Sequence, residues 1–330
     1  MKLASYQDGS RDGQLLVVSR DLSLAHYATQ VANRLQQVLD DWNFLSPQLQ
    51  SIYDALNAGR ARHAFPFDAA QCMAPLPRAH QVLLADACPS RDALLRRATG
   101  HEQGTGQLGL QQCAGDALLG AHDALPAVPE EFGLDFCAGV AVITGDIPRG
   151  CEAERALDGV RLLALGNALT VRNLLNPDGS PSVQSHCATA FSPVAVTPDE
   201  LGEAWHRGRI QLPLYSSLNG RKLGMVAVGS AMGSHFGQII AQVARVRRLQ
   251  AGSVVLAAPV SEAGVEKKGA WNWPAGFHSL TEKRASEQLQ GGQSSTAWLQ
   301  AGDVLRIEMK NASGHSVFGA IEQTVAGARG

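Results

Sequence analysis

The amino-acid sequence predicts an α+β protein that is mainly β and has a small N-terminal domain. Two observations lead to this class. Short apolar runs alternate with turns rich in Gly, Pro and Asn, and only a few segments repeat apolar residues at helical spacing. Strands joined by tight turns are antiparallel, so we do not expect a doubly wound parallel sheet. A chain of 330 residues is long enough for one large domain, or for a large domain and a small one.

Residues 1–72 are predicted to form the small domain, which begins with a hairpin. Two β-type runs, Lys2–Gln7 and Gln14–Ser19, flank a turn at residues 8–13. The Gly and Asp residues of this turn permit a positive φ, which a tight connection between strands requires.

Two helical patterns follow the hairpin. The first covers residues 31–42, and the second has apolar residues at helical spacing from Leu49 to Leu56. Ser46 predicts the N-cap of the second helix, with Pro47 at its first helical position. Gly59 predicts its end.

Residues 73–330 are predicted to form the larger, strand-rich domain. Val140–Thr144 is a continuous apolar run, typical of a buried strand. Asn219-Gly220 lies between two strand patterns and is the strongest short hairpin signal in the chain. A second hairpin is predicted around residues 311–314.

A few helices interrupt these strands. Thr197–Glu200 resembles a capping box and predicts a short helix that ends near Arg207. Residues 229–233 contain a pair of glycines and are predicted to be a loop. A further helix is predicted from one apolar face, which consists of Phe236, Ile239, Ile240 and Val243.

Composition excludes several classes of partner. Lys and Arg number 28, and Asp and Glu 30, so the formal net charge is −2 at pH 7. Without a charged tail, we expect no nucleic-acid groove and no membrane surface. No run approaches the ~20 apolar residues that span a bilayer, and the first residues turn polar too soon for a signal peptide. The six cysteines form no Cys-x-x-Cys pair, which favours reduced thiols. We therefore expect a soluble, cytoplasmic protein.

Several sequence blocks occur in order along nearly the whole chain. They are residues 1–22, Pro75–Ala79, Arg172–Leu174, Ala190–Gly202, Glu282–Arg284 and Phe318–Gln323. These blocks resemble bacterial proteins of the fumarylacetoacetate hydrolase (FAH) family. The resemblance implies an FAH-type mixed β-sandwich roll that carries the active-site cleft, after a small N-terminal domain. It also implies a homodimer that cleaves C–C bonds in acylpyruvates or β-diketo acids with Mg²⁺, Mn²⁺ or Ca²⁺.

The resemblance further implies where the family's active-site groups would lie. Its Glu-x-Glu carboxylates correspond to Cys137 and Gly139, and a third metal-binding carboxylate corresponds to Ala168. The catalytic His corresponds to Arg91, and a substrate-binding Lys to His186. The residues kept from the family pattern are Arg172, Gln184, Ser185 and Glu282.

These replacements argue against the family's usual reaction. Mg²⁺ and Ca²⁺ require hard oxygen ligands, and the three carboxylates are missing. Asp135 shares a strand face with Cys137 and could supply one carboxylate, which would hold Mg²⁺ only weakly. Without a metal there is no Lewis acid, and without the His there is no evident general base. The sequence therefore predicts no metal and no other cofactor.

The first functional hypothesis is a metal-independent enzyme acting on a small β-keto or acylpyruvate-type acid, by C–C cleavage, decarboxylation or isomerisation. Arg172 would hold a carboxylate and Gln184 would orient a carbonyl. His186 would act as an acid or base, and Cys137 would become a nucleophile if His186 lowered its pKa. The candidate residues are catalytic His186, Cys137 and Glu282, and substrate-binding Arg172, Gln184 and Ser185.

Other interpretations stay open. The protein could be a non-catalytic binder of a small carboxylic acid, or a partner subunit. Zn²⁺ could be bound by Cys137, Cys187 and His186. Each candidate also has a structural explanation: Cys137 could fill a vacated pocket, Arg172 could pair with Glu282 or another carboxylate, and His186 could be a solvated loop residue. The standard metal-dependent hydrolase is the least expected of these functions.

Overall fold

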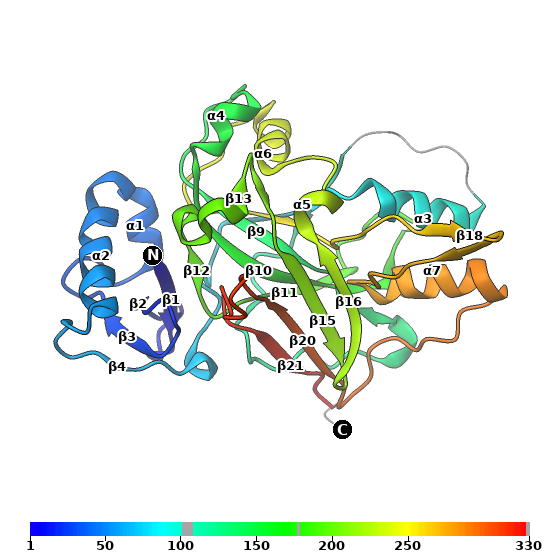
Figure 1. The fold of residues 1–330 in the computed structure, drawn as a ribbon, viewed down its shortest axis with the longest axis horizontal. Helices are drawn as coiled ribbons and strands as arrows, with labels where there is room; N and C mark the ends of the chain where they lie inside the picture. Colours follow the sequence, from blue (N-terminus) through cyan, green and yellow to red (C-terminus); the bar gives the residue numbers. More distant parts are fainter. Residues whose placement is uncertain (101–107, 177–178, 328–330) are drawn as a thin grey trace.

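The computed structural model describes residues 1–100, 108–176 and 179–327. These residues form a 13-stranded mixed sheet, on which a four-stranded antiparallel sheet packs, with helices around both (Figure 1). The predicted α+β class, mainly β, is confirmed.

The main sheet runs in the order β4-β3-β2-β1-β12-β10-β9-β17-β5-β6, and β7, β8 and β11 join it around β10. Most neighbours are antiparallel, but β17 pairs with β5 in parallel, as does β7 with β11. The strands are β1 (Lys2–Tyr6), β2 (Gln14–Val18), β3 (Leu24–Tyr27), β4 (Phe65–Pro66), β5 (Gln81–Asp86), β6 (Gly109–Cys113), β7 (Leu118–Leu119), β8 (Leu134–Asp135), β9 (Ala138–Thr144), β10 (Val160–Val171), β11 (His186–Phe191), β12 (Ala195–Val196) and β17 (Ser253–Ala257).

The second sheet runs in the order β16-β15-β20-β21, and two small hairpins, β13-β14 and β18-β19, stand apart. These strands are β13 (Trp205–His206), β14 (Arg209–Ile210), β15 (Pro213–Leu218), β16 (Arg221–Ala227), β18 (Val265–Lys267), β19 (Ala270–Asn272), β20 (Val304–Met309) and β21 (Ile321–Thr324). The α-helices are α1 (Leu35–Asp40), α2 (Trp42–Asn57), α3 (Pro89–Thr99), α4 (Ala153–Leu157), α5 (Val228–Ala231), α6 (Phe236–Ala244) and α7 (Leu280–Gly291). Short 3₁₀ helices are η1 (Ala69–Gln71), η2 (Glu130–Phe132), η3 (Arg172–Leu174) and η4 (Pro198–Ala204).

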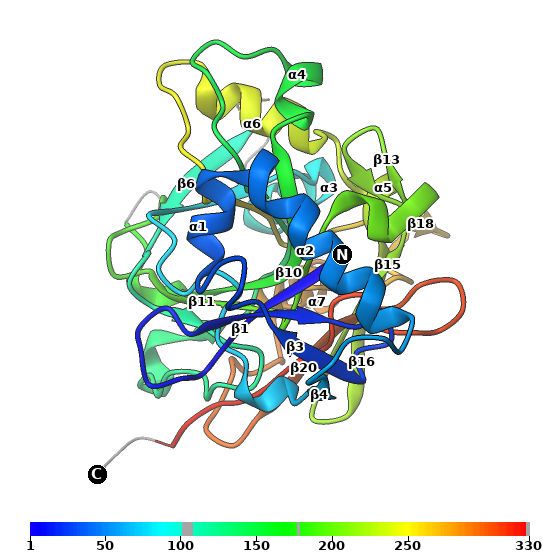
Figure 2. The same cartoon turned by 90° about the vertical axis from the view of Figure 1, so that its left-hand side faces the viewer.

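The N-terminal strands and helices lie together at one end of the molecule. Seen from that end, α1 and α2 lie in front of β1, β2 and β3 (Figure 2). Because strand side chains alternate between faces, Leu15 and Val17 of β2 pack with the α1–α2 side. Leu16 and Val18 belong to the hydrophobic core on the other face. Since β1 also pairs with β12, these strands continue the main sheet, and a domain boundary at residue 72 stays a prediction.

The predicted start of the second helix is wrong. Helix α2 begins at Trp42, directly after α1, and Pro47 lies inside it. The carbonyl of Asp41 accepts the amides of Phe44 and Leu45, so the helix is established before Pro47, whose missing N–H costs one helical hydrogen bond. The predicted end is confirmed, because α2 ends at Asn57 and Gly59 has a positive φ.

In the rest of the chain, the buried strand at 140–144 and both hairpins are confirmed, as β9, β15–β16 and β20–β21. Asn219 and Gly220 both have positive φ, as a two-residue hairpin turn of this kind requires. The helix predicted after Thr197 is the 3₁₀ helix η4, which is interrupted by the non-helical backbone of Gly202. The Thr197 hydroxyl contacts the Met1 main chain and does not cap the helix. The predicted loop after residue 228 contains the short helix α5.

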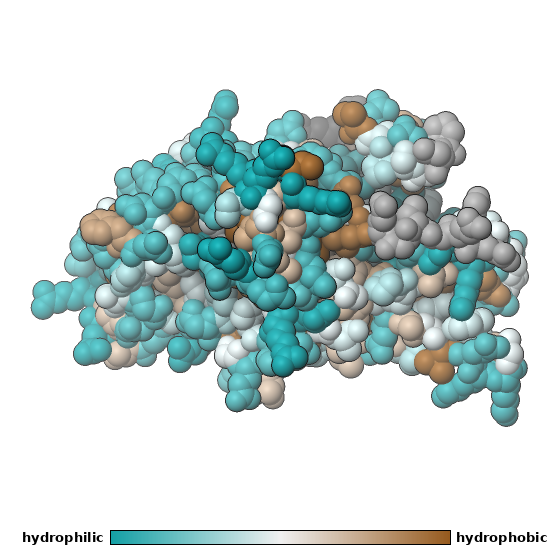
Figure 3. Space-filling view, turned by 90° about the horizontal axis from the view of Figure 1, so that it is seen from above, coloured by the Kyte–Doolittle hydropathy of each residue, from teal (hydrophilic) through white to brown (hydrophobic). Residues whose placement is uncertain are grey.

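None of the described helices is long and apolar enough to cross a membrane. On the face seen in Figure 3, hydrophobic side chains form small groups among hydrophilic ones.

Candidate active site

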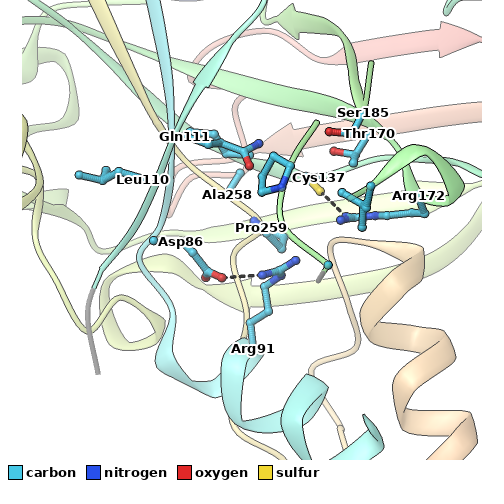
Figure 4. Close-up of a pocket in the computed structure, with 15 residues that line it drawn as sticks. Asp86, Arg91, Leu110, Gln111, Cys137, Thr170, Arg172, Ser185, Ala258 and Pro259 are labelled. Atoms are coloured by element: carbon cyan, nitrogen blue, oxygen red, sulfur yellow. Dashed lines mark hydrogen bonds and ion pairs between the residues drawn. The ribbon is translucent and has the colours of Figure 1, made fainter. Parts of the chain in front are cut away.

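A cavity of about 260 Å³ lies where β5, β9 and the end of β10 meet the start of α3 (Figure 4). Arg91 enters it from α3, and Arg172 enters from the chain that follows β10. Its main polar lining consists of Asp86, Arg91, Gln111, Cys137, Thr170 and Arg172.

One side of the cavity is held by an ion pair between Arg172 and Asp135. The Asp135 side chain is fully buried at the end of β8, and its Oδ2 lies 2.9 Å from Arg172 Nε and 2.8 Å from Nη2. Asp135 Oδ1 also accepts the amide of Leu280 at 2.7 Å, and Oδ2 accepts the hydroxyl of Thr281 at 2.7 Å. A carboxylate at the first turn of α7 is stabilised by the helix dipole. Arg172 therefore pairs with a carboxylate of the protein, which is the structural explanation that the sequence left open.

Cys137 follows Asp135 and lines the cavity beside Arg172. Its Sγ accepts a hydrogen bond from Arg172 Nη2 at 3.2 Å, and its main-chain amide is bound by Asn167 Oδ1. Burial raises the pKa of the Cys137 thiol to about 11. The thiol is therefore protonated near neutral pH, contrary to what the predicted nucleophile requires.

His186 is not where the predicted acid–base role needs it. The ring is buried in β11 and does not line the cavity. Its Nδ1 accepts the amide of Ala114 at 3.3 Å, and its Nε2 lies 3.2 Å from Thr189 Oγ1. Burial lowers the pKa of His186 to about 4, so the imidazole is neutral and both nitrogens are occupied. These contacts indicate a structural role for His186. They also leave Cys137 without the imidazole that was predicted to lower its pKa.

The two neighbours of His186 in the predicted site also differ from expectation. Gln184 is exposed and does not line the cavity. Ser185 does line it, but its hydroxyl donates to the carbonyl of Ser182 and accepts the Ser182 amide. Of the predicted substrate-binding residues, Arg172 and Ser185 reach the cavity.

Glu282 lies behind the cavity in the first turn of α7. Its Oε2 accepts the hydroxyl of Ser279, the N-cap of the helix, and its Oε1 has no hydrogen-bond partner in the described chain. Burial raises the pKa of Glu282 to about 7, and the nearby charge of Arg91 limits the increase. A carboxyl group with a pKa near neutrality often marks a functional site.

The other side of the cavity holds an ion pair that the sequence analysis missed. Arg91 Nη1 donates to Asp86 Oδ2 at 2.5 Å, while Arg91 Nε and Asp86 Oδ1 are buried and have no partner among the described residues. Asp86 ends β5 and Arg91 lies in the first turn of α3. An Asp at the end of an apolar run, five residues before an Arg, was the available signal. Nothing comparable in the sequence points to Gln111 or Thr170, which reach the cavity only through sheet pairing.

The described residues do not fit the metal ion that the family resemblance implies. At Gly139 a Cβ atom would lie 2.0 Å from the carbonyl oxygen of Ala257, so no carboxylate side chain fits there. Ala168 is fully buried, and both oxygens of Asp135 accept hydrogen bonds. In the described parts of the chain, no group of three or more His, Cys, Asp or Glu residues could hold a metal. This also overturns the zinc hypothesis for Cys137, Cys187 and His186, and Cys187 Sγ instead contacts the carbonyl of Leu169.

The fold and the cavity define an α+β protein with a small polar site at the end of its main sheet. Residues 112–326 match the family model for the C-terminal domain of fumarylacetoacetate (FAA) hydrolase, and residues 1–78 match fumarylacetoacetase N-terminal domain 2. The chain therefore belongs to the fumarylacetoacetate hydrolase family. No protein with a curated description matches it in sequence.

Solved structures share the fold over the whole chain. Fumarylacetoacetate hydrolase from Exiguobacterium antarcticum is 18% identical, with a TM-score of 0.68, over 99% of this chain and 100% of that one. Maleylpyruvate hydrolase from Sphingobium, in complex with manganese(II) and pyruvate, is 17% identical, with a TM-score of 0.63 and full coverage of both chains. A 5-carboxymethyl-2-hydroxymuconate delta-isomerase from Mycobacterium smegmatis is 14% identical, with a TM-score of 0.60 and full coverage of both. At these identities the likeness establishes the fold alone.

Proposed function

We propose that the protein is a divergent FAH-family enzyme that acts on a small β-keto or acylpyruvate-type acid without a metal ion. The reaction would be C–C cleavage, decarboxylation or isomerisation. The observation that carries the proposal is the cavity itself: two guanidinium groups, of Arg91 and Arg172, line it. By the resemblance to the family, Cys137, Gly139 and Ala168 stand where the metal-binding carboxylates would be.

The chemistry of such acids suits a cavity lined by guanidinium groups. Cleavage or decarboxylation next to a carbonyl group leaves an enolate, and preorganised donors that face the developing negative charge lower the barrier. Guanidinium groups stay protonated at all relevant pH values, so they supply positive charge without a metal. Pockets for drug-sized ligands enclose roughly 300–1,000 Å³. A volume of about 260 Å³ therefore favours a smaller acid.

The proteins with the same fold support this reaction class. Their printed names describe hydrolases of maleylpyruvate and fumarylacetoacetate and an isomerase of a hydroxymuconate. We carry over the acidic substrate, because Arg91 and Arg172 suit it. The manganese of the Sphingobium complex is not carried over, because the donor set here lacks the carboxylates that would hold it.

The test is turnover of a panel of β-keto acids and acylpyruvates by the full chain, with and without EDTA. We expect at least one acid to be converted at the same rate in both conditions. The control variant is Arg96→Gln, because Arg96 is on the same helix as Arg91 but does not line the cavity. Its rates should equal those of the wild type. Activity that EDTA abolishes and Mn²⁺ restores would contradict metal independence.

A second candidate function is a non-catalytic binder of a small acid. It is favoured by the protonation and pairing of the described groups around the cavity: Asp86 and Asp135 are in ion pairs, and Cys137 is a thiol. Calorimetry that detects binding of acids from the panel, with no turnover of any of them, would favour this function over the enzyme.

We also propose a homodimer, on the family resemblance alone. Light scattering at micromolar concentration would contradict it by showing a single species near 34.9 kDa.

A further inference from the structure

We propose that Arg91, and not Arg172, binds the carboxylate of the ligand, through the guanidinium nitrogens that Asp86 leaves free. This inference rests on the proposed function only in taking the ligand to be a carboxylic acid. It assigns the recognition step to the residue that stands where the family pattern has a His.

The two arginines differ in which nitrogens are already used. A guanidinium binds a carboxylate best in a bidentate manner, with two N–H groups directed at it. In Arg172, Nε and Nη2 both face Asp135 Oδ2, and Nη2 also donates to Cys137 Sγ. In Arg91, Nη1 alone is bound, to Asp86 Oδ2, and its other two nitrogens make no hydrogen bond within the described residues.

The partners of the two arginines differ in the same way. Asp135 is fully buried, so a movement of Arg172 away from it would leave a buried carboxylate without its counter-ion. Asp86 itself lines the cavity, its side chain is 27% exposed, and one of its oxygens has no partner among the described residues. Arg91 can therefore accept a second anion while Asp86 keeps its orientation.

Unpartnered polar atoms gather around Arg91. Arg91 Nε, Asp86 Oδ1 and Glu282 Oε1 are all buried and make no hydrogen bond to the part of the chain that the structure describes, and the three residues interact electrostatically. Buried polar atoms without a partner are rare in native proteins, and each calls for an explanation. A ligand carboxylate that accepts hydrogen bonds from Arg91 explains the free guanidinium nitrogens, and a hydroxyl group of the ligand can donate to Asp86, which also lines the cavity.

The experiment is isothermal titration of the full chain with oxalate and with pyruvate, in the presence of EDTA. We expect Arg91→Gln to weaken the binding of both acids by at least about tenfold, as loss of a charge-assisted hydrogen-bond pair does. Arg91→Lys keeps the charge but loses the planar fork, so it is expected to weaken binding by a smaller factor. The matched control Arg96→Gln removes the same charge from the same helix, and its dissociation constants should stay within about twofold.

Two outcomes would overturn the inference. The first is a wild-type protein that binds neither acid. The second is Arg91 variants that keep wild-type affinity while Arg172→Lys, with an unchanged melting temperature, loses it. Where Arg91→Gln fails to fold, because it leaves Asp86 unpaired, the affinity of Arg91→Lys decides between the two arginines.

Turnover is measured separately, so that this inference and the proposed function can fail independently. An Arg91 variant that binds the acids normally but is inactive contradicts this inference alone. A wild-type protein that binds the acids through Arg91 without turnover contradicts only the proposed enzymatic activity.

Discussion

The cavity has two sides, and each is built on one Arg–Asp pair. The Asp135–Arg172 pair has a fully buried carboxylate that accepts hydrogen bonds from an arginine, two helix amides and a hydroxyl. In the Asp86–Arg91 pair both side chains are partly exposed, and each has a polar atom without a partner in residues 1–100, 108–176 and 179–327. We call the Asp135–Arg172 pair closed, because its carboxylate is fully buried and fully hydrogen-bonded, and the Asp86–Arg91 pair open, because it can still accept a ligand.

This difference shows that residue type alone does not identify a binding arginine. Both pairs join the same two residue types, and both arginines line the same cavity. What separates them is the place of the carboxylate: Asp135 lies at the first turn of α7, whereas Asp86 ends a strand at the cavity wall. Arg172 therefore stabilises the fold, and Arg91 remains available to a ligand.

The largest expected effect is on stability, from replacing the two aspartates. Asp135→Asn leaves a buried guanidinium without its counter-ion and puts an amide against donors, so we expect the free energy of unfolding to fall by about 3–5 kcal/mol. Asp86→Asn, at the open pair, is expected to cost about 1 kcal/mol. Urea unfolding followed by circular dichroism measures both. Equal losses at the two positions would contradict the distinction between a closed and an open pair.

The next largest effect is on stability at Gly139, and it tests whether the backbone there leaves room for a metal-binding side chain. At Gly139 a Cβ would contact the Ala257 carbonyl oxygen and the Ala258 side chain, so Gly139→Ala should destabilise the protein by about 1–3 kcal/mol or more. Gly291→Ala is the control, because a Cβ there meets nothing within 4 Å, and its effect should stay within about 0.5 kcal/mol. A Gly139→Ala protein as stable as the wild type would mean that the backbone leaves room for a side chain, and the metal question would reopen.

A smaller effect is the pH dependence of stability that Glu282 causes. The pKa of Glu282 is raised from 4.5 to about 7, so between these values the folded protein keeps a proton that the unfolded chain has released. Stability from this group is therefore present at low pH and is lost as the pH rises through 7. We expect melting temperatures of Glu282→Gln to fall less than those of the wild type between pH 4.5 and 7.

His186 should change the pH dependence of stability in the opposite direction. Its pKa is lowered from 6.5 to about 4, so the unfolded chain takes up a proton first as the pH falls, and stability is lost on acidification. His186→Gln should therefore reduce the loss of stability between pH 6.5 and 4. Identical pH profiles for the wild type and both variants would show that neither group is perturbed by burial.

The sequence predicts the strands and hairpins of this fold well, because those signals are local. The short apolar run of β2 and the Asn219-Gly220 turn each specify their local structure without help from distant residues. The start of α2 was predicted wrongly, because Pro47 is a strong helix-start signal and the earlier start depends on α1 ending directly before it.

The candidate site was only partly predictable, for a different reason. Family-like blocks place Arg172, Cys137 and Ser185 at the cavity, where the structure has them. No local pattern shows that His186 binds the amide of Ala114, or that Asp135 binds the first amides of α7, because these contacts join segments far apart in the chain. Hydrogen-bond partners, more than residue types, decide which side chain is free to act.

The smallest expected effect is on the chemical reactivity of the Cys137 thiol, which lines the cavity beside Arg172. Burial raises the pKa of Cys137 to about 11, and Arg172 covers its sulfur, so the reactive thiolate is scarce. Mass spectrometry of the native protein after brief treatment with iodoacetamide at pH 7.5 should find Cys151, which is partly exposed, alkylated before Cys137. The unfolded protein should lose this order. Fast alkylation of native Cys137 would instead indicate an activated nucleophile, and Arg172 would then be its activator as well as the partner of Asp135.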